Sequence, residues 1–305
     1  MFAVGTASDV GTKYVQQITS RTTKNVDATG NRMEDAHGNR VGFLYTRSAV
    51  ADGHGSIEVA PGRFIGGYEA ARLAATQFSK SKVRNEHDMR RFFQRLQLKI
   101  RRRARQWVTA KSRAKMAKNF QVRLASGKST GLNFGTTLAA VYLRREGVSR
   151  IKCVVGNVGD TEVLLVSSNE SRKLSVKHTV DNPQEVDRIK RAGGNVSGKY
   201  FEVEDRAVQV SRSLGHLCTP VIVWNPSVGE FHVAPGDILI IASDGLWDHM
   251  SREKAAQIVR GHSDAEKAAV DLLRQRNKRC VYDNATVTVI FLRNVPWGSF
   301  GDLSR

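Results

Sequence analysis

The residues of this chain best suited to chemistry are acidic, and each group of them lies at the edge of an apolar segment of strand length. Asp52 follows residues 48–51, and Asp244 comes just after residues 238–242. A segment that is apolar on both faces is typical of a buried strand, so a carboxylate just past its end is held rigidly and partly desolvated. The acidic groups are Glu34-Asp35, Asp52-Gly53-His54-Gly55, Gly159-Asp160, Asp244 to Asp248, and Asp283-Asn284.

Several carboxylates brought to one place would repel one another without a cation. Hard divalent ions such as Mg²⁺ and Mn²⁺ prefer oxygen ligands and complete their coordination with water. Two such ions about 4 Å apart can hold a hydroxide and clamp a phosphate. The acidic groups therefore predict a metal-dependent hydrolase, although each Asp-Gly pair taken singly is more often an ordinary turn.

The strands and helices that must position these acids occur in separate groups along the sequence and do not alternate one by one. The order is strands, helices, many strands, helices and a final strand, which predicts an α+β fold with largely antiparallel sheets. Asn182-Pro183 begins one short helix and Gly193-Gly194 ends it. The predicted strands are 41–45, 48–51, 136–143, 150–155, 162–166, 208–210, 229–233, 237–242 and 285–292; the other predicted helices are 68–78, 89–107, 252–260 and 264–276.

The long helix carries apolar residues at steps of three and four, and its opposite face is strongly basic. A solvated face is the favoured interpretation of residues 84–128, and a docking surface for an acidic partner is the alternative. Nucleic acid is the less favoured partner, because Phe92, Phe93 and Trp107 fall on the buried side and leave no stacking platform. The basic residues are Arg90, Arg91, Arg95, Lys99, Arg101, Arg102, Arg103, Arg105, Lys111, Arg113, Lys115 and Lys118.

Composition sets broad limits on the class of protein. The 305 residues are 40% hydrophobic with only 6 Pro and no evident linker, so a single domain over 1–305 is expected. A net charge of +19 and a pI near 10.2 favour acidic partners without choosing among them. Three scattered cysteines fit a reducing compartment, and neither a secretory signal nor a membrane span is expected. A monomer in the cytoplasm, the nucleus or both is predicted.

Eight segments, in this order, resemble the type 2C family of metal-dependent Ser/Thr protein phosphatases. Together they span about residues 30–292, and the resemblance implies hydrolysis of phosphoserine and phosphothreonine in proteins. It also implies an α+β fold with a central β-sandwich of two mostly antiparallel sheets, flanked by pairs of helices in four layers (α-β-β-α). The segments are Met33–His37, Ala51–Gly55, Gly135–Thr137, Gly156–Asp160, His178 with Glu185–Gly194, Val210–Gly215, Ala242–Asp248 and Asp283–Asn284.

The resemblance also implies ligands for two Mg²⁺ or Mn²⁺ ions that share a bridging hydroxide. Asp52 would bridge the two ions, and the carbonyl oxygen of Gly53 would join the second. Glu34 and Asp35 would hold metal-bound water.

Further roles carry over to the C-terminal half of the chain. Asp244 and Asp283 would complete the shell of the first ion, and Asp160, Asp244 and Asp248 would frame a third, weaker ion. His54 would be the general acid that protonates the leaving alkoxide, a role that suits an imidazole with an ordinary pKa of about 6.5.

Two departures from the family pattern keep an alternative open. The family's phosphate-binding arginine is replaced by Gly30; Arg32 is the favoured substitute, because it falls on the same side of an extended segment, and Arg21 is the other choice. His216 occupies a position where the family usually has Asp. The alternative is a weak or inactive phosphatase-like module that binds an acidic partner through residues 84–128.

Overall fold

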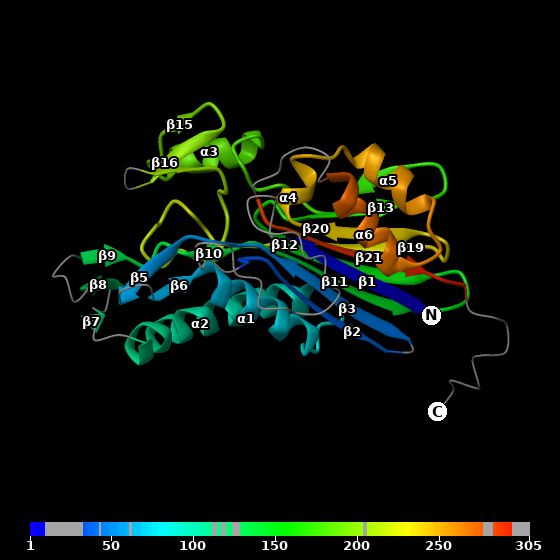
Figure 1. The fold of residues 1–305 in the computed structure, drawn as a ribbon, viewed down its shortest axis with the longest axis horizontal. Helices are drawn as coiled ribbons and strands as arrows, with labels where there is room; N and C mark the ends of the chain where they lie inside the picture. Colours follow the sequence, from blue (N-terminus) through cyan, green and yellow to red (C-terminus); the bar gives the residue numbers. More distant parts are fainter. Residues whose placement is uncertain are drawn as a thin grey trace.

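The computed structural model describes residues 1–9, 33–42, 44–60, 63–111, 115–116, 120–123, 129–203, 206–276 and 283–294. Two antiparallel five-stranded sheets form the centre of the fold (Figure 1). In the first sheet the order is β1-β21-β20-β13-β14, and in the second it is β19-β12-β11-β3-β2. The first sheet comprises β1 (Phe2–Asp9), β13 (Glu162–Val166), β14 (Ser171–Lys173), β20 (Ile238–Ala242) and β21 (Ala285–Leu292); the second comprises β2 (Ala36–Val41), β3 (Tyr45–Ala51), β11 (Leu138–Arg145), β12 (Ile151–Val158) and β19 (Ser227–Val233).

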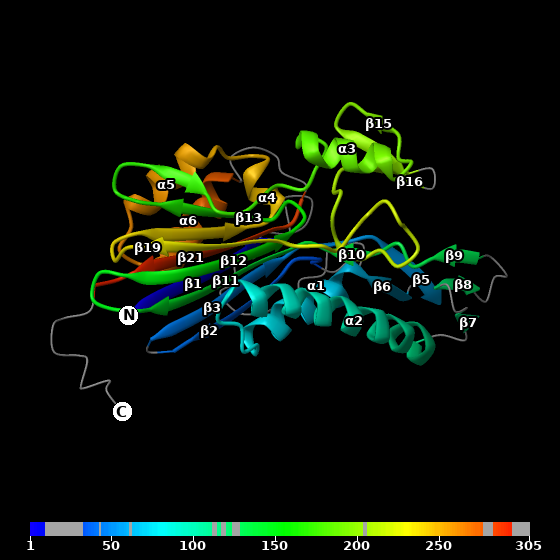
Figure 2. The ribbon, with the colours of Figure 1, turned by 180° about the vertical axis from the view of Figure 1, so that it is seen from behind.

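Helices cover the outer face of each sheet. The helices α1 (Gly67–Ser79) and α2 (Glu86–Lys111) pack on the second sheet, while α5 (Arg252–Arg260) and α6 (Ala265–Arg276) pack on the first; Figure 2 shows the same layers from behind. One apolar core lies between the two sheets and one lies under each helix pair. These layers confirm the predicted α-β-β-α arrangement.

Smaller elements gather at one end of the sandwich. The short strands β4 (Gly53–His54), β10 (Gly135–Thr136) and β18 (Leu214–Gly215) form one sheet there, and the one-turn helix α4 (Asp244–Trp247) follows β20. The helix α3 (Pro183–Arg191) and its three-stranded sheet stand beside this end (Figure 1). The remaining strands are β15 (Val196–Ser197), β16 (Tyr200–Val203) and β17 (Arg206–Val208) next to α3, the pair β5 (Ser56–Ala60) and β6 (Arg63–Gly66), and the sheet of β7 (Lys115–Met116), β8 (Gln121–Arg123) and β9 (Ser129–Gly131).

The local sequence explains the bounds of the main helices. Asn182 caps α3 by accepting a hydrogen bond from the amide of Gln184 at 3.1 Å, and Pro183 occupies the first helical position, where no amide donor is needed. In α2 the residues Met89, Phe93 and Ile100 are fully buried, as the spacing predicted.

No helix among the described residues is long and apolar enough to cross a membrane.

Two predicted strands are wrong in their bounds. Residues 41–45 are not one strand, because the Gly42 amide donates to the Tyr45 carbonyl at 2.8 Å and turns the chain between β2 and β3. Residues 208–210 overlap only the end of β17, and Val210 instead forms an isolated bridge with Thr179. The prediction of a single domain over 1–305 stays a prediction.

Candidate metal centre

The second sheet delivers three acids to the end of the sandwich that lies near α4 and β10 (Figure 1). Asp52 follows β3, while Glu34 and Asp35 precede β2. Because β2 and β3 are antiparallel, the end of one meets the start of the other, and Ala36 pairs with Ala51. Hydrogen-bond register therefore places the acids of two distant motifs side by side.

The first sheet delivers two more acids by the same rule. Asp244 follows β20 and Asp283 precedes β21, and the antiparallel register pairs Ala242 with Val287. Asp160 lies in the turn that connects β12 to β13, and so joins one sheet to the other. The acids of both sheets thus meet across the top of the central core.

Burial and mutual repulsion favour the protonated forms of these acids. Burial, followed by the charges of Asp35 and Asp283, raises the pKa of Glu34 to about 8. Burial raises the pKa of Asp35 to about 7, against a 2.7 Å hydrogen bond from the Ser243 hydroxyl. The surrounding protein and then Asp244 raise the pKa of Asp283 to about 6, even though this residue lies at the exposed rim.

Asp52 and Asp160 show the same effect more strongly. Burial, then the charges of Asp35 and Asp244, raises the pKa of Asp52 well above its ordinary value. Burial, then the charge of Asp244, does the same for the pKa of Asp160. Each carboxylate would be stabilised by a nearby positive charge.

Unpartnered oxygens identify what these acids can bind. One carboxylate oxygen each of Asp35, Asp160 and Asp244 is buried and accepts no hydrogen bond in the part of the chain that the structure describes. Buried polar atoms are normally satisfied, so three such oxygens in one place suit a hard divalent cation. The described side chains do not already place three His, Cys, Asp or Glu groups around a metal position.

Gly53 allows the backbone to pass through the centre. A Cβ atom at this position would lie 2.3 Å from the carbonyl carbon of Gly67 and 2.9 Å from the carbonyl oxygen of Glu34, so no larger residue fits. The Gly53 amide donates to that Glu34 carbonyl at 3.3 Å, and the Glu34 amide donates to the Asn284 side chain at 3.0 Å. Three separate motifs are therefore tied together through the backbone of Glu34, which bonds to the Gly53 amide and to the Asn284 side chain.

Two motifs, those with Thr136-Thr137 and with His178, contain no predicted metal ligand. Their residues form hydrogen bonds with the backbone of the motifs that contain Asp52 and Asp160. The Asp52 carbonyl accepts hydrogen bonds from the Thr137 amide at 2.8 Å and from the Thr136 hydroxyl at 2.9 Å. The His178 imidazole accepts a hydrogen bond from the Gly159 amide at 3.1 Å and so supports the turn before Asp160. These contacts explain why the threonines and the histidine accompany the acids in the sequence.

His54 lies beside the acids, in contact with the residue that departs from the family pattern. Its Nε2 atom is 2.8 Å from Nε2 of His216 and 3.0 Å from the Ser213 hydroxyl. Burial lowers the pKa of His54 to about 4, and the Asp244 charge acts in the opposite direction. His216 adopts a left-handed φ of 46°, and its ring centroid lies 4.9 Å from that of His54.

Arg276 is a residue of the centre that the sequence analysis missed. Its side chain is 1% exposed at the end of α6, where its guanidinium lies 3.5 Å from the Asp9 carboxylate and donates to the Asp283 carbonyl. The sequence signal that could have revealed it is its place in the helix, because Arg276 continues the buried stripe formed by Ala269, Leu272 and Leu273. The charge of this buried guanidinium therefore acts on Asp283, Asp35 and Asp244.

Glu185 holds the α3 region against the rest of the site. It accepts hydrogen bonds from the Ser211 hydroxyl at 2.7 Å and from the Arg212 and Arg188 side chains at 2.9 and 3.0 Å. Burial alone would raise the pKa of Glu185, but the hydrogen bonds from Arg212, Ser211 and Arg188 outweigh it and hold the pKa at about 2. This network gives a structural role to the motif that contains Glu185, for which the sequence alone predicted no role.

Two predicted site residues lie apart from the enclosed cluster. Asp248 is exposed at the end of α4, with its carboxylate 4.0 Å from the Lys177 ammonium. Arg32, the predicted phosphate-binding residue, lies outside the described residues, as do the alternative Arg21 and the departing Gly30. Their roles stay predictions.

Comparison with known proteins gives this arrangement a family context. Residues 31–285 match the family model described as Protein phosphatase 2C. The chain is 33% identical over 159 residues to Probable protein phosphatase 2C 11 of Arabidopsis thaliana, covering 52% of this chain and 42% of that protein. It is 29% identical over 143 residues to Protein phosphatase 2C homolog 1 of Saccharomyces cerevisiae, covering 46% and 50%. The chain thus spans half or less of the length of these curated relatives.

Solved structures support the fold. A Mycobacterium tuberculosis serine/threonine phosphatase, PstP/Ppp, superimposes with a TM-score of 0.57 at 18% identity, covering 96% of this chain and 99% of that one. A C. elegans sex-determining protein superimposes with a TM-score of 0.68 at 18% identity, covering 95% and 65%. At these identities the likeness establishes the architecture alone.

The acidic centre should make the stability of the metal-free protein depend on pH. The folded pKa values of Glu34 and Asp35, about 8 and 7, lie above unfolded values of about 4, so the folded state binds more protons and loses stability as the pH rises. Above about pH 7.5 histidines are almost fully neutral in both the folded and the unfolded states, so the acids dominate the dependence on pH there. We expect the Tm of chelator-treated protein to fall by a few degrees between about pH 7.5 and 9.

Differential scanning fluorimetry would measure this trend, with Mn²⁺ restoring the Tm most strongly at the upper pH. The matched variant Glu34→Gln should flatten the slope. A Tm that stays level or rises across the window in the parent protein would contradict the assignment.

Removal of the buried guanidinium should destabilise the fold. Arg276→Met removes the buried guanidinium that lies 3.5 Å from the Asp9 carboxylate, and breaking a buried ion pair typically costs about 3–5 kcal/mol. Urea unfolding of metal-free protein would measure the loss. The control Arg274→Met changes an exposed arginine of the same helix and should stay within about 0.5 kcal/mol of the parent; equal effects of the two changes would refute the role of Arg276.

Proposed function

Because this chain belongs to the protein phosphatase 2C family, we propose that it hydrolyses phosphoserine and phosphothreonine side chains of proteins with the help of divalent metal ions. The observation that carries the proposal is the set of buried carboxylate oxygens of Asp35, Asp160 and Asp244, which lie at one end of the sandwich and have no hydrogen-bond partner among the described residues. Such groups are costly for a fold that makes no use of them. The full activity and substrates are part of the proposal, since the chain spans only part of its relatives' length.

Mg²⁺ or Mn²⁺ would be held by Asp52, the Gly53 carbonyl and Asp244, with Glu34 and Asp35 acting through water. Asp283 would join the first ion, and the exposed Asp248 would help to hold a third, weaker ion together with Asp160. When bound, such ions supply a nucleophile from water near neutral pH and neutralise charge on the phosphoryl group.

His54 is the proposed proton donor to the leaving alkoxide. Its low pKa makes the ring neutral near pH 7, and a dianionic phosphate placed beside it would favour the charged, acidic form. The contacts with Ser213 and His216 hold Nε2 at a defined position next to the acids. Arg32 is the proposed phosphate-binding residue.

One specific observation favours a second candidate function. His216 contacts the proposed proton donor directly, where the family usually has an acid, and two neighbouring imidazoles disfavour protonation of each other. A slow or inactive phosphatase-like module that binds an acidic partner would tolerate this change. Turnover measurements separate the two candidates.

Asp52→Ala and Asp244→Ala should each lower metal-dependent turnover of a phosphothreonine peptide by at least about 100-fold, since each removes a ligand on which transition-state stabilisation depends. Assays with Mn²⁺, with Mg²⁺ and with chelator would measure the effect. Asp187→Ala, a change of an exposed acid on α3, is the control and should retain activity. No turnover by well-folded parent protein with any metal would refute the enzyme and leave the binding module.

His54→Gln should affect substrates according to their leaving groups. General acid catalysis typically contributes about 10²–10⁴-fold, and it matters most for a basic leaving group such as the threonine alkoxide. We expect a loss of about 100-fold or more with the phosphothreonine peptide and a much smaller loss with an aryl phosphate. His87→Gln, at an exposed position of α2, is the control; equal losses on both substrates would show that His54 does not donate the proton.

A further inference from the structure

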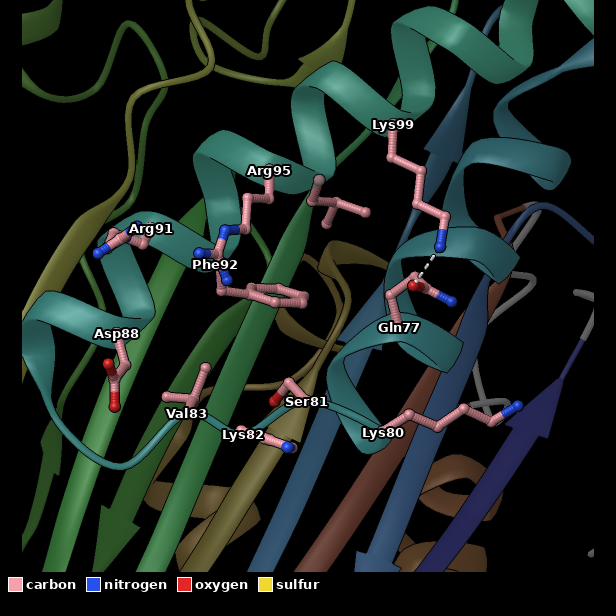
Figure 3. A pocket seen from close by; sticks show the side chains of 11 residues that line it. Gln77, Lys80, Ser81, Lys82, Val83, Asp88, Arg91, Phe92, Arg95 and Lys99 are labelled. Atoms are coloured by element: carbon pink, nitrogen blue, oxygen red, sulfur yellow. Dashed lines mark hydrogen bonds between the residues drawn. The ribbon is translucent and has the colours of Figure 1, made fainter.

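A cavity of about 370 Å³ lies where the C-terminal end of α1 turns into α2 (Figure 3). It is separate from the candidate metal centre. The first residue of α1, Gly67, packs against Gly53, whereas the cavity lies beyond the last turn of the same helix. A helix of 13 residues is about 20 Å long, so the two sites lie at opposite ends of α1.

Positive charge dominates the lining of this cavity. The lining includes the cations Lys80, Lys82, Arg91, Arg95 and Lys99 and a single acid, Asp88. The Asp88 carboxylate already accepts a hydrogen bond from the Arg84 amide at 3.1 Å. The cavity therefore has a large excess of positive charge.

The cations of the cavity differ from the others on α2. Arg101 and Arg105 each lie 4.8 Å from the centre of the Phe120 ring, and Arg90 lies 3.5 Å from the Glu86 carboxylate. By contrast, Arg91 and Arg95 are exposed and form no ion pair with any residue in the described part of the chain. Much of the basic face is thus occupied by intramolecular contacts, and these two arginines are available to a partner.

Lys80 and Lys82 add two more unpaired cations from the α1–α2 connection, again among the described residues. Lys99 donates to the Gln77 side chain at 2.5 Å and joins the two helices across the cavity, as Figure 3 shows. The cations that line the cavity therefore come from α2 and from the α1–α2 connection rather than from a single stripe of one helix.

The floor of the cavity is apolar and rigid. Phe92 is half-buried, and its ring meets the edge of Phe78 with the centroids 5.2 Å apart. Val83 and Leu96 are buried beside it. The Ser81 hydroxyl oxygen is buried without a hydrogen-bond partner among the described residues, so it has a free donor for a ligand oxygen.

We propose that this cavity binds an acidic segment of a partner protein. Carboxylates of the segment would meet Arg91, Arg95 and the two lysines, and a neighbouring apolar side chain would pack on Phe92. A volume of this size fits one or two side chains. The concave arrangement of the cations and the half-buried aromatic ring favour a peptide over nucleic acid, which requires exposed rings or cations spaced along a groove.

The test is a direct binding measurement with the full chain, independent of any catalytic activity. Fluorescence anisotropy at a fixed salt concentration would report binding of a labelled peptide that has one Leu flanked by Asp and Glu residues. A second peptide, with Asn and Gln in place of the acids, measures the contribution of charge. Duplex DNA is the competitor for the alternative partner.

The double variant Arg91→Glu with Arg95→Glu should weaken binding of the acidic peptide roughly tenfold or more, because attraction becomes repulsion at the rim. The matched control is Arg102→Glu with Arg103→Glu, which makes the same charge change at exposed positions of the same helix outside the cavity. The control should bind nearly as the parent does, and the amide peptide should bind weakly to all three proteins.

Three outcomes would overturn the proposal. They are absence of binding by the acidic peptide, equal losses in both double variants, and tighter binding of duplex DNA with the same dependence on Arg91 and Arg95. Turnover of an aryl phosphate should be the same in both variants as in the parent, and if the parent shows no turnover, the binding result still stands by itself.

Discussion

Repulsion among carboxylates that are withdrawn from water is the constraint on which this structure depends. Asp35, Asp52, Asp160 and Asp244 lie within electrostatic range of one another at the end of the sandwich, and the ionised forms of Asp35, Asp52 and Asp160 are destabilised first by burial and then by neighbouring charge. Only a rigid support can hold such groups together. Two packed antiparallel sheets provide it, since each acid follows or precedes a strand whose register is set by a continuous apolar core.

The protein relieves part of this repulsion with its own groups. Arg276 places a positive charge below the acids, and the Ser243 hydroxyl donates to Asp35. The backbone contacts of Thr137 and Asn284 then fix the loops without using the carboxylate oxygens themselves. Within the described part of the chain, these supports leave one oxygen each of Asp35, Asp160 and Asp244 without a hydrogen-bond partner, so the groups that still require positive charge lie in a single region.

The sequence predicts elements well where burial alone decides them, and less well where pairing decides them. The bounds of β13, α5 and β21 are those predicted, because their apolar periodicity is strong. Strand β1 is not among the predicted strands, because its Gly and Ala residues give a weak pattern and its identity comes from pairing with β21. The acids could be predicted as a group from the family resemblance, but the contact between His54 and His216 joins residues 162 positions apart and depends on the folded chain.

The net charge of the chain does not show where its acidic and basic residues lie. A total of +19 says only that acidic partners are favoured. In the structure, buried acids gather at one end of α1, and cations that form no ion pair among the described residues gather at the other, while Arg101 and Arg105 lie over the Phe120 ring. Because exposed charges are screened within about 10 Å in salt solution, two sites of opposite sign about 20 Å apart act almost independently. The helix that separates them therefore allows one chain to attract cations at its centre and acidic groups at its edge without either charge cancelling the other.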